Sequence, residues 1–218
     1  ITGNFDDAQS AVKTIFTDEE MIKELDERGF MFSSANSINI GRLIPQVAYY
    51  WYAYCTLVRK GNIKAGDKIN FTVPTGNFGN ILAGYFAKKM GLPVNKFICA
   101  SNSNKVLYDF FRTGTYDRNR EFILTVSPSM DILISSNLER LVCMLTSQEE
   151  TAKLMKALAS DGKYTMTVKA DDIVGEYADE EETFTAIRTM HANTGYVIDT
   201  HTAVAYAAYD KYIKESGD

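Results

Sequence analysis

The stretch that most constrains the fold runs from residue 68 to residue 101, because it predicts two strands joined by a helix. Residues 68–73 alternate polar and apolar side chains, which favours a short strand that ends at Pro74. Apolar side chains recur at helical spacing over residues 81–90, and a second strand-like run covers residues 96–101. This order is the crossover unit of a parallel sheet, so we expect an α/β protein.

The turn between the first strand and the helix predicts an anion-binding site. It reads Thr75-Gly76-Asn77-Phe78-Gly79-Asn80, and its two glycines let the backbone approach a ligand closely. Unpaired N–H groups at a helix start attract negative charge. The turn lacks the third glycine of a dinucleotide fingerprint and the Lys-Ser/Thr of a nucleoside-triphosphate loop, so we expect it to hold an isolated phosphate group. A tight turn without a ligand has the same glycine spacing, and the spacing alone does not separate the two.

Composition and charge exclude several classes of function. The 218 residues are 45% hydrophobic and 23% charged, which suits one large domain or two small ones. A net charge of −5, without a cluster of Lys, Arg and aromatic residues, argues against nucleic-acid binding. Three widely spaced cysteines argue against a disulfide framework and a zinc site. With no apolar run of about 18 residues, we expect a cytoplasmic protein without a membrane partner.

Periodicity predicts further elements outside the crossover. Helices are expected over residues 8–16, 40–58, 104–112, 138–145, 148–159 and 203–213, and strands over residues 29–33, 163–168 and 195–198. The acidic run at residues 179–182 is interpreted as a helix start rather than a metal site, because negative charge complements the helix dipole there. The aromatic residues between positions 49 and 54 are interpreted as core packing or a subunit contact.

The glycine turn and its flanks, residues 73–84, resemble the cofactor-phosphate loop of threonine synthase, a pyridoxal-phosphate (PLP) enzyme of the tryptophan-synthase-like fold. Further segments resemble the same family in the same order, namely residues 2–9, 34–42, 127–132 and 195–204. The resemblance implies a three-layer α/β fold of PLP fold type II, here incomplete, with a mostly parallel sheet and helices on both faces. It implies a remnant of a preceding domain or unit at residues 1–30 and a large cofactor-binding domain at residues 31–218.

The resemblance also implies an activity and a cofactor site. Threonine synthases are PLP-dependent lyases of threonine biosynthesis that convert O-phospho-L-homoserine and water to L-threonine and phosphate. The cofactor ring acts as an electron sink, while the protein fixes the phosphate. The residues whose backbone amides are implied to hold that phosphate are Gly76, Asn77, Phe78, Gly79 and Asn80. Many relatives have Asp at the last position, a difference that leaves a backbone cradle intact.

A second helix start is implied to lie near the mouth of the active site. The implied substrate-binding residues are Asn36, Ser37, Asn39 and Arg42. Arg42 is a candidate partner for the substrate phosphate, because a guanidinium binds phosphate with two hydrogen bonds. Ser37 or Asn39 can cap the helix that follows. The structural alternative is that Ser37 does so and Arg42 forms a surface salt bridge. Asp131 and Asp199 are expected to form turns and His201 to lie in a cap region, with a place in the cleft as the alternative for each.

The lysine that forms a Schiff base with PLP in this family lies in a Phe-Lys-Asp context, and none of the lysines here has that context. The Ser/Thr-rich segment that contacts the ring nitrogen is also missing. We therefore expect a fragment without a catalytic residue, which binds PLP weakly, does not turn over alone, and self-associates through exposed apolar surface. The alternatives are a non-catalytic phosphate-binding module and another fold-type-II PLP lyase; residues 36–39 and 129–132 favour threonine synthase over the latter.

Overall fold

A three-stranded parallel sheet with the order β1-β2-β5 lies at the centre of the computed structural model, which describes residue 3 and residues 5–217. Its strands are β1 (Ile69–Pro74), β2 (Val94–Ser101) and β5 (Ile173–Tyr177). A separate antiparallel pair joins β3 (Thr115–Asp117) to β4 (Lys163–Thr165). In the main sheet Val73 lies opposite Cys99, and Cys99 lies opposite Gly175.

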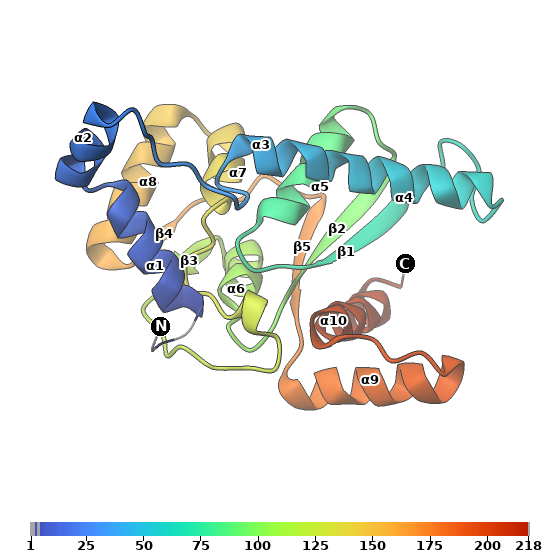
Figure 1. Cartoon of the computed structure of the whole chain (residues 1–218). Coiled ribbons are helices and arrows are strands. Elements are labelled where there is room, and N and C mark those ends of the chain that lie inside the picture. The colour runs from blue at the N-terminus through green and yellow to red at the C-terminus, as the bar shows by residue number, and fades with distance from the viewer. Residues whose placement is uncertain (1–2, 4, 218) are drawn as a thin grey trace.

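Helices cover both faces of this sheet, as the resemblance implies (Figure 1). The α-helices are α1 (Phe5–Phe16), α2 (Glu19–Glu27), α3 (Ile40–Leu43), α4 (Val47–Arg59), α5 (Gly79–Lys89), α6 (Val106–Thr113), α7 (Leu138–Leu145), α8 (Gln148–Asp161), α9 (Glu180–Thr194) and α10 (Thr200–Ser216). Two 3-10 helices are η1 (Ile44–Gln46) and η2 (Pro128–Met130). Helices α4 and α5 lie over one face, and α10 packs on the other with α9 beside it (Figure 1). The three-layer α/β architecture is confirmed.

The two faces of the sheet have cores of different character. Neighbouring strand residues point to opposite faces, so Cys99 joins the larger core beneath α5 while Ala100 joins the core beneath α10. The larger core is rich in aromatic side chains, and Tyr50 meets Phe71 edge to face at 5.0 Å. The core beneath α10 consists mainly of alanines, which let the helix lie close to the sheet.

The crossover at residues 69–101 and the predicted helices are confirmed, but two predicted strands are wrong. Residues 29–33 are irregular, because Gly29 adopts a left-handed φ of +75° directly after α2. Residues 195–198 connect α9 to α10, because Gly195 (φ +74°) ends one helix and Asp199 begins the next. The predicted helix over residues 40–58 is interrupted by the η1 turn, which contains Pro45.

The aromatic residues of α4 divide between the interior and the surface. Tyr50 and Tyr54 are buried, which confirms core packing for that side of the helix, whereas Tyr49 and Tyr52 are exposed. The acidic residues before α9 do begin a helix: Asp179 and Glu182 form a reciprocal capping box.

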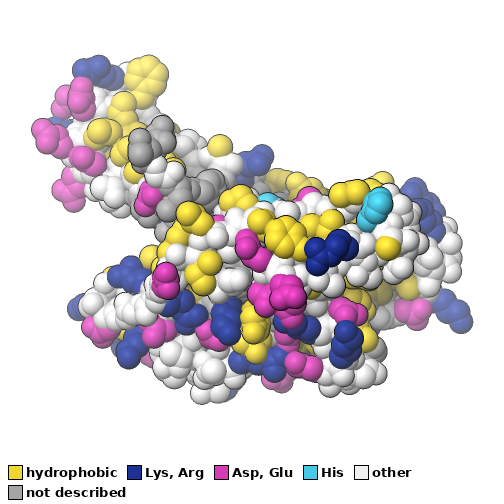
Figure 2. Space-filling view, turned by 90° about the horizontal axis from the view of Figure 1, so that it is seen from below, with side chains coloured by type: hydrophobic (Ala, Val, Ile, Leu, Met, Phe, Trp, Pro, Cys, Tyr) yellow, Lys and Arg dark blue, Asp and Glu magenta, His cyan; other side chains and the backbone are white. Residues whose placement is uncertain are grey.

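The N-terminal helices α1 and α2 project from the body as a lobe whose tip carries acidic side chains (Figure 2). Helix α2 has no buried residue among those that the structure describes, and Met31 just beyond it is 86% exposed. Whether such exposed apolar side chains cause self-association stays a prediction. Within the described residues, no helix has the length and apolar character needed to cross a lipid bilayer.

Asp199 supplies a testable contribution to stability at the start of α10. Its Oδ1 accepts hydrogen bonds from the N–H groups of His201 (2.9 Å) and Thr202 (3.2 Å), and the Thr202 hydroxyl donates to Oδ2. The Thr202 hydroxyl and these amides lower the pKa of Asp199. A lowered folded pKa gives stability that is present above the unfolded pKa of about 3.9 and is lost as the pH falls through the folded value.

We expect Asp199→Ala to lower the free energy of unfolding by about 1 kcal/mol at pH 7, and by less at pH 3. Urea unfolding at the two pH values measures the difference. Asp171→Ala, a change at an exposed aspartate outside any helix, serves as the control and should stay within about 0.5 kcal/mol. An equal loss at both pH values would contradict a role for the ionised carboxylate.

Candidate functional site

The turn from β1 into α5 lies at the carboxyl end of the sheet, where ligands bind in open α/β folds. The N–H group of Thr75 donates to the carbonyl of Ala100 at 2.9 Å and so continues the pairing of β1 with β2. Phe78 then adopts a left-handed conformation with φ +65°. Its ring is buried and stacks on Phe111 at 6.0 Å, so core packing stabilises a backbone geometry that non-glycine residues rarely adopt.

Four backbone amides of this turn make no hydrogen bond with any part of the chain that the structure describes. They are the N–H groups of Gly76, Asn77, Phe78 and Asn80. The N–H of Gly79 is already used, because it donates to Asn77 Oδ1 at 2.9 Å. Residues at the start of α5 have no intrahelical acceptor, so the positive end of the helix dipole adds to these amides. This arrangement provides several donors for one anion.

The two glycines of the turn are required by close packing. A Cβ atom on Gly76 would lie 2.3 Å from the carbonyl oxygen of Ser129, and one on Gly79 would lie 2.3 Å from Ser37 Oγ. Neither glycine has a positive φ, whereas Phe78 does. The glycines therefore admit two neighbouring segments of the protein, and the unusual backbone conformation belongs to the residue between them.

The side chain of Asn80 is fixed to α4 and η1. Its Oδ1 accepts from the Tyr50 hydroxyl at 2.7 Å, and its Nδ2 donates to Gln46 Oε1 at 3.3 Å. Burial raises the pKa of Tyr50 far above its usual value, so the phenol stays protonated and remains a donor. These contacts turn the Asn80 side chain toward α4 and η1, while its backbone amide makes no hydrogen bond with the described residues. The periodicity of α4 gave no signal for these polar contacts.

The structure brings one of the four candidate substrate residues against the turn. Ser37 is buried, and its Oγ accepts from Asn137 Nδ2 at 3.0 Å. Asn36 and Asn39 hold their own segment: Asn36 Oδ1 accepts from the N–H of Ile38, and Asn39 caps α3. Of the two residues that can cap this helix, Asn39 does so and Ser37 does not.

Arg42, the fourth candidate, is exposed and forms no ion pair with the residues that the structure describes. The surface salt bridge that was its structural alternative is therefore not present there. Whether its guanidinium binds a substrate phosphate stays a prediction.

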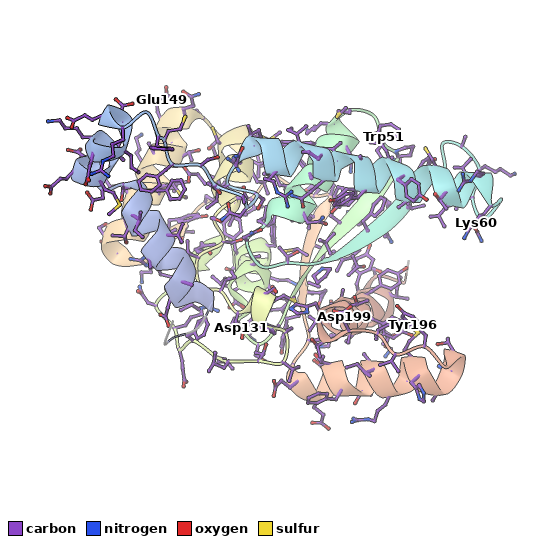
Figure 3. All side chains as sticks on the ribbon, viewed as in Figure 1. Trp51, Lys60, Asp131, Glu149, Tyr196 and Asp199 are labelled. Carbon is purple, nitrogen blue, oxygen red and sulfur yellow. The ribbon has the colours of Figure 1, made fainter. Side chains whose placement is uncertain are left out.

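Asp131 is the centre of a buried hydrogen-bond network rather than a simple turn residue. Its Oδ1 accepts from Asn102 Nδ2 (2.7 Å), Asn104 Nδ2 (3.1 Å) and Thr125 Oγ1 (2.7 Å). Its Oδ2 accepts from the N–H of Thr125 at 2.9 Å. Asp131 follows η2, whose Ser129 carbonyl faces Gly76, so this network fixes one wall of the turn (Figure 3). The sequence predicted a turn position for Asp131 but did not predict that its side chain is buried.

Asp199 lies near the same wall at the start of α10 (Figure 3), and His201 follows it two residues later in the chain. The Nε2 atom of His201 accepts from the N–H of Ser129 at 3.2 Å. Asp199, which was expected in a turn, is the N-cap of α10. The hydrogen bond between His201 and Ser129 was not predicted, because the two residues are 72 positions apart in the chain.

Together these features define a parallel α/β protein with a row of uncommitted amides where its first strand passes into a helix. No protein-family model matches the chain. Among curated proteins, Threonine synthase-like 1 of Homo sapiens is 44% identical over 220 residues, which is 97% of this chain and 30% of that protein. Threonine synthase of Saccharomyces cerevisiae is 36% identical over 238 residues, covering 100% of this chain and 45% of the yeast protein.

Solved structures give the same result. PLP-bound threonine synthase from Brucella melitensis matches with a TM-score of 0.83 and 37% identity, covering 96% of this chain and 44% of that one. The yeast enzyme matches with a TM-score of 0.83, 37% identity and coverage of 100% and 45%. The chain therefore has the PLP fold type II of these enzymes and matches a part of threonine synthase and of threonine synthase-like proteins. It spans about 30–45% of the length of the relatives it matches.

Proposed function

We propose that the turn at residues 76–80 binds the phosphate group of PLP, and that the protein containing these 218 residues is a lyase acting on O-phospho-L-homoserine. The observation that carries the proposal is the set of four uncommitted amides at the start of α5. The threonine synthase from Brucella melitensis, which has the same fold, binds PLP in its crystal structure. PLP, when bound, supplies an electron sink for carbanions, while the protein binds and orients it.

The residues of the turn fit a phosphate monoester in their chemistry. A phosphate has several acceptor oxygens, and the backbone of the turn offers several donors. The Asn77 side chain and the Phe78 ring hold the backbone in place, as Oδ1 of Asn77 accepts the Gly79 amide and the ring is buried. In this proposal Ser37 lies behind the turn, and Arg42 is available for a second phosphate, that of the substrate.

We extend the proposal to the organisation of the chain and to its activity. Residues 31–218 would form the cofactor-binding domain, and residues 1–30 would belong to a preceding unit. The absence of buried side chains from the described part of α2 supports this division. None of the residues that we propose to contact PLP is a lysine, so we expect these 218 residues alone to bind the phosphate without turning over phosphohomoserine.

Titration of the chain with pyridoxine 5′-phosphate and with pyridoxine tests the proposed site. Neither compound has an aldehyde, so reaction with surface lysines does not contribute. We expect the phosphorylated compound to bind at least about tenfold more tightly, measured by calorimetry, because only it reaches the amides. Equal binding of the two compounds would overturn the proposal. If inorganic phosphate binds as tightly as pyridoxine 5′-phosphate, the non-catalytic phosphate-binding module is favoured instead.

A further inference from the structure

We propose that Ser135 and Asn137 are positioning residues that hold the phosphate turn from behind, and that Asn137 also couples this turn to the segment at residues 36–39. The inference rests on the proposed function of the turn and adds to it a device that orients its amides. Neither residue was singled out by the sequence, because both lie in the loop before α7 and about 60 positions after the turn.

Two carbonyl groups of the turn accept hydrogen bonds from the loop before α7. Ser135 Oγ donates to the carbonyl of Gly76 at 2.7 Å. The backbone N–H of Asn137 donates to the carbonyl of Asn77 at 2.9 Å, and its Nδ2 donates to the same oxygen at 3.0 Å. Ser135 is 5% exposed and Asn137 is fully buried. Two consecutive carbonyls of the turn are therefore bound on the side away from solvent.

The geometry of the peptide bond relates these carbonyls to the amides of the turn. In a planar trans peptide the C=O and N–H groups point in opposite directions. The carbonyl of Gly76 shares its peptide with the N–H of Asn77, and the carbonyl of Asn77 shares its peptide with the N–H of Phe78. Because both carbonyls are held by residues 135–137, both amides face away from that loop. These are two of the four amides that make no hydrogen bond with the described residues.

Arg140 fixes the orientation of the Asn137 side chain. Its Oδ1 accepts a hydrogen bond from the guanidinium of Arg140, and a guanidinium has donors only. The Nδ2 group must then face the opposite way, toward the carbonyl of Asn77 and toward Ser37 Oγ at 3.0 Å. Arg140 also donates to the carbonyls of Ser37 (3.0 Å) and Ile38 (2.5 Å). The Asn137 side chain thus contacts both the turn and the segment at residues 36–39, and Arg140 holds that side chain in place.

The position of Asn137 on its own helix supports this role. It is the N-cap residue of α7, where an asparagine side chain usually accepts a hydrogen bond from the helix backbone, yet it makes no such bond. Ser147, the N-cap of the neighbouring α8, does accept one from the N–H of Glu150. The side chain of Asn137 is instead committed to the turn and to Ser37.

Hydrogen exchange of the full chain, with and without pyridoxine 5′-phosphate, tests the coupling. In the unmodified protein we expect the ligand to slow exchange at least about fivefold in peptides covering residues 74–82 and in peptides covering residues 34–42. In Asn137→Ala we expect ligand affinity to fall about tenfold or more. At saturating ligand, protection should return at residues 74–82 but not at residues 34–42.

Asn119→Ala is a matched control, because the Nδ2 of Asn119 also donates to a distant backbone carbonyl, that of Asp161, at 2.7 Å. It should leave affinity and both protected regions unchanged. If Asn137→Ala does not fold, Ser135→Ala and Ser37→Ala test the two parts of the proposal separately. The first removes one carbonyl contact and should weaken binding about fivefold. The second removes the acceptor on the neighbouring segment and should abolish only the protection at residues 34–42.

The outcomes separate the two proposals. If the unmodified protein shows no ligand-induced protection at residues 74–82, the proposed phosphate site fails and this inference fails with it. If that protection appears but Asn137→Ala retains wild-type affinity and coupled protection, the positioning role alone is overturned. The same conclusion follows if Ser135→Ala and Ser37→Ala both behave like the unmodified protein.

Discussion

Gly76→Ala is expected to remove phosphate binding and to lower the free energy of unfolding by about 2 kcal/mol. The added Cβ would lie 2.3 Å from the carbonyl oxygen of Ser129, 3.4 Å from its carbonyl carbon and 3.5 Å from the Cα of Met130. These are backbone atoms, which cannot rotate away as a side chain can. Either the turn or the opposite wall must therefore move, and the wall is fixed by Asp131.

Urea unfolding and titration with pyridoxine 5′-phosphate measure the two effects of Gly76→Ala. We expect affinity to fall at least about tenfold, since displacement of the turn misaligns its amides. Gly61→Ala is the control: Gly61 has φ +73° and open space around its Cβ position. That change should cost about 1 kcal/mol through backbone strain and leave binding unaltered. Wild-type affinity in Gly76→Ala would contradict the proposed cradle.

The second large effect is expected for Asp131→Asn, which should lower the free energy of unfolding by about 3 kcal/mol or more. Every hydrogen bond of this buried carboxylate is one that it accepts, from Asn102, Asn104 and Thr125. An asparagine replaces one oxygen by an NH₂ group, which then faces a donor. At least one buried donor loses its acceptor, at a cost of about 1–3 kcal/mol, and the NH₂ group itself is left unpaired.

Asp210→Asn is the control for this substitution. It makes the same chemical change in an exposed ion pair, between Asp210 and Lys214 at 2.6 Å on α10, and should cost no more than about 0.5 kcal/mol. Both variants are compared by urea unfolding at pH 7. We also expect Asp131→Asn to weaken pyridoxine 5′-phosphate binding, because the wall that carries Ser129 loses its support. A loss below about 1 kcal/mol would show that the network reorganises around the amide.

The parts of the fold that the sequence predicts are those with local signals. The first crossover follows from alternation in β1, helical spacing in α5 and the glycine turn between them. Strand β5 was missed because Gly175 and Glu176 interrupt its apolar pattern. Glu176 is tolerated inside because Arg112 on α6 pairs with it, although burial raises its pKa. That pairing joins residues 64 positions apart, which no local pattern reports.

The candidate site likewise has parts with a local sequence signal and parts that depend on contacts between distant residues. The turn was predictable because its glycines lie between a strand and a helix. Which amides remain uncommitted was not, because that depends on the Asn77 side chain taking the Gly79 amide. The contact of Ser37 with Asn137 spans 100 positions, so no local pattern predicts it. The resemblance to threonine synthase pointed to these segments, but not to the side chains that hold them together.

The left-handed Phe78 has a consequence for how the turn meets a ligand. Its ring is held in the core against Phe111, so the backbone on either side has little freedom to rearrange. The entropy of ordering these residues is lost during folding rather than during association. An anion that fits the turn would therefore find it preorganised, and its association rate should be set by diffusion and electrostatic attraction instead of a slow loop closure.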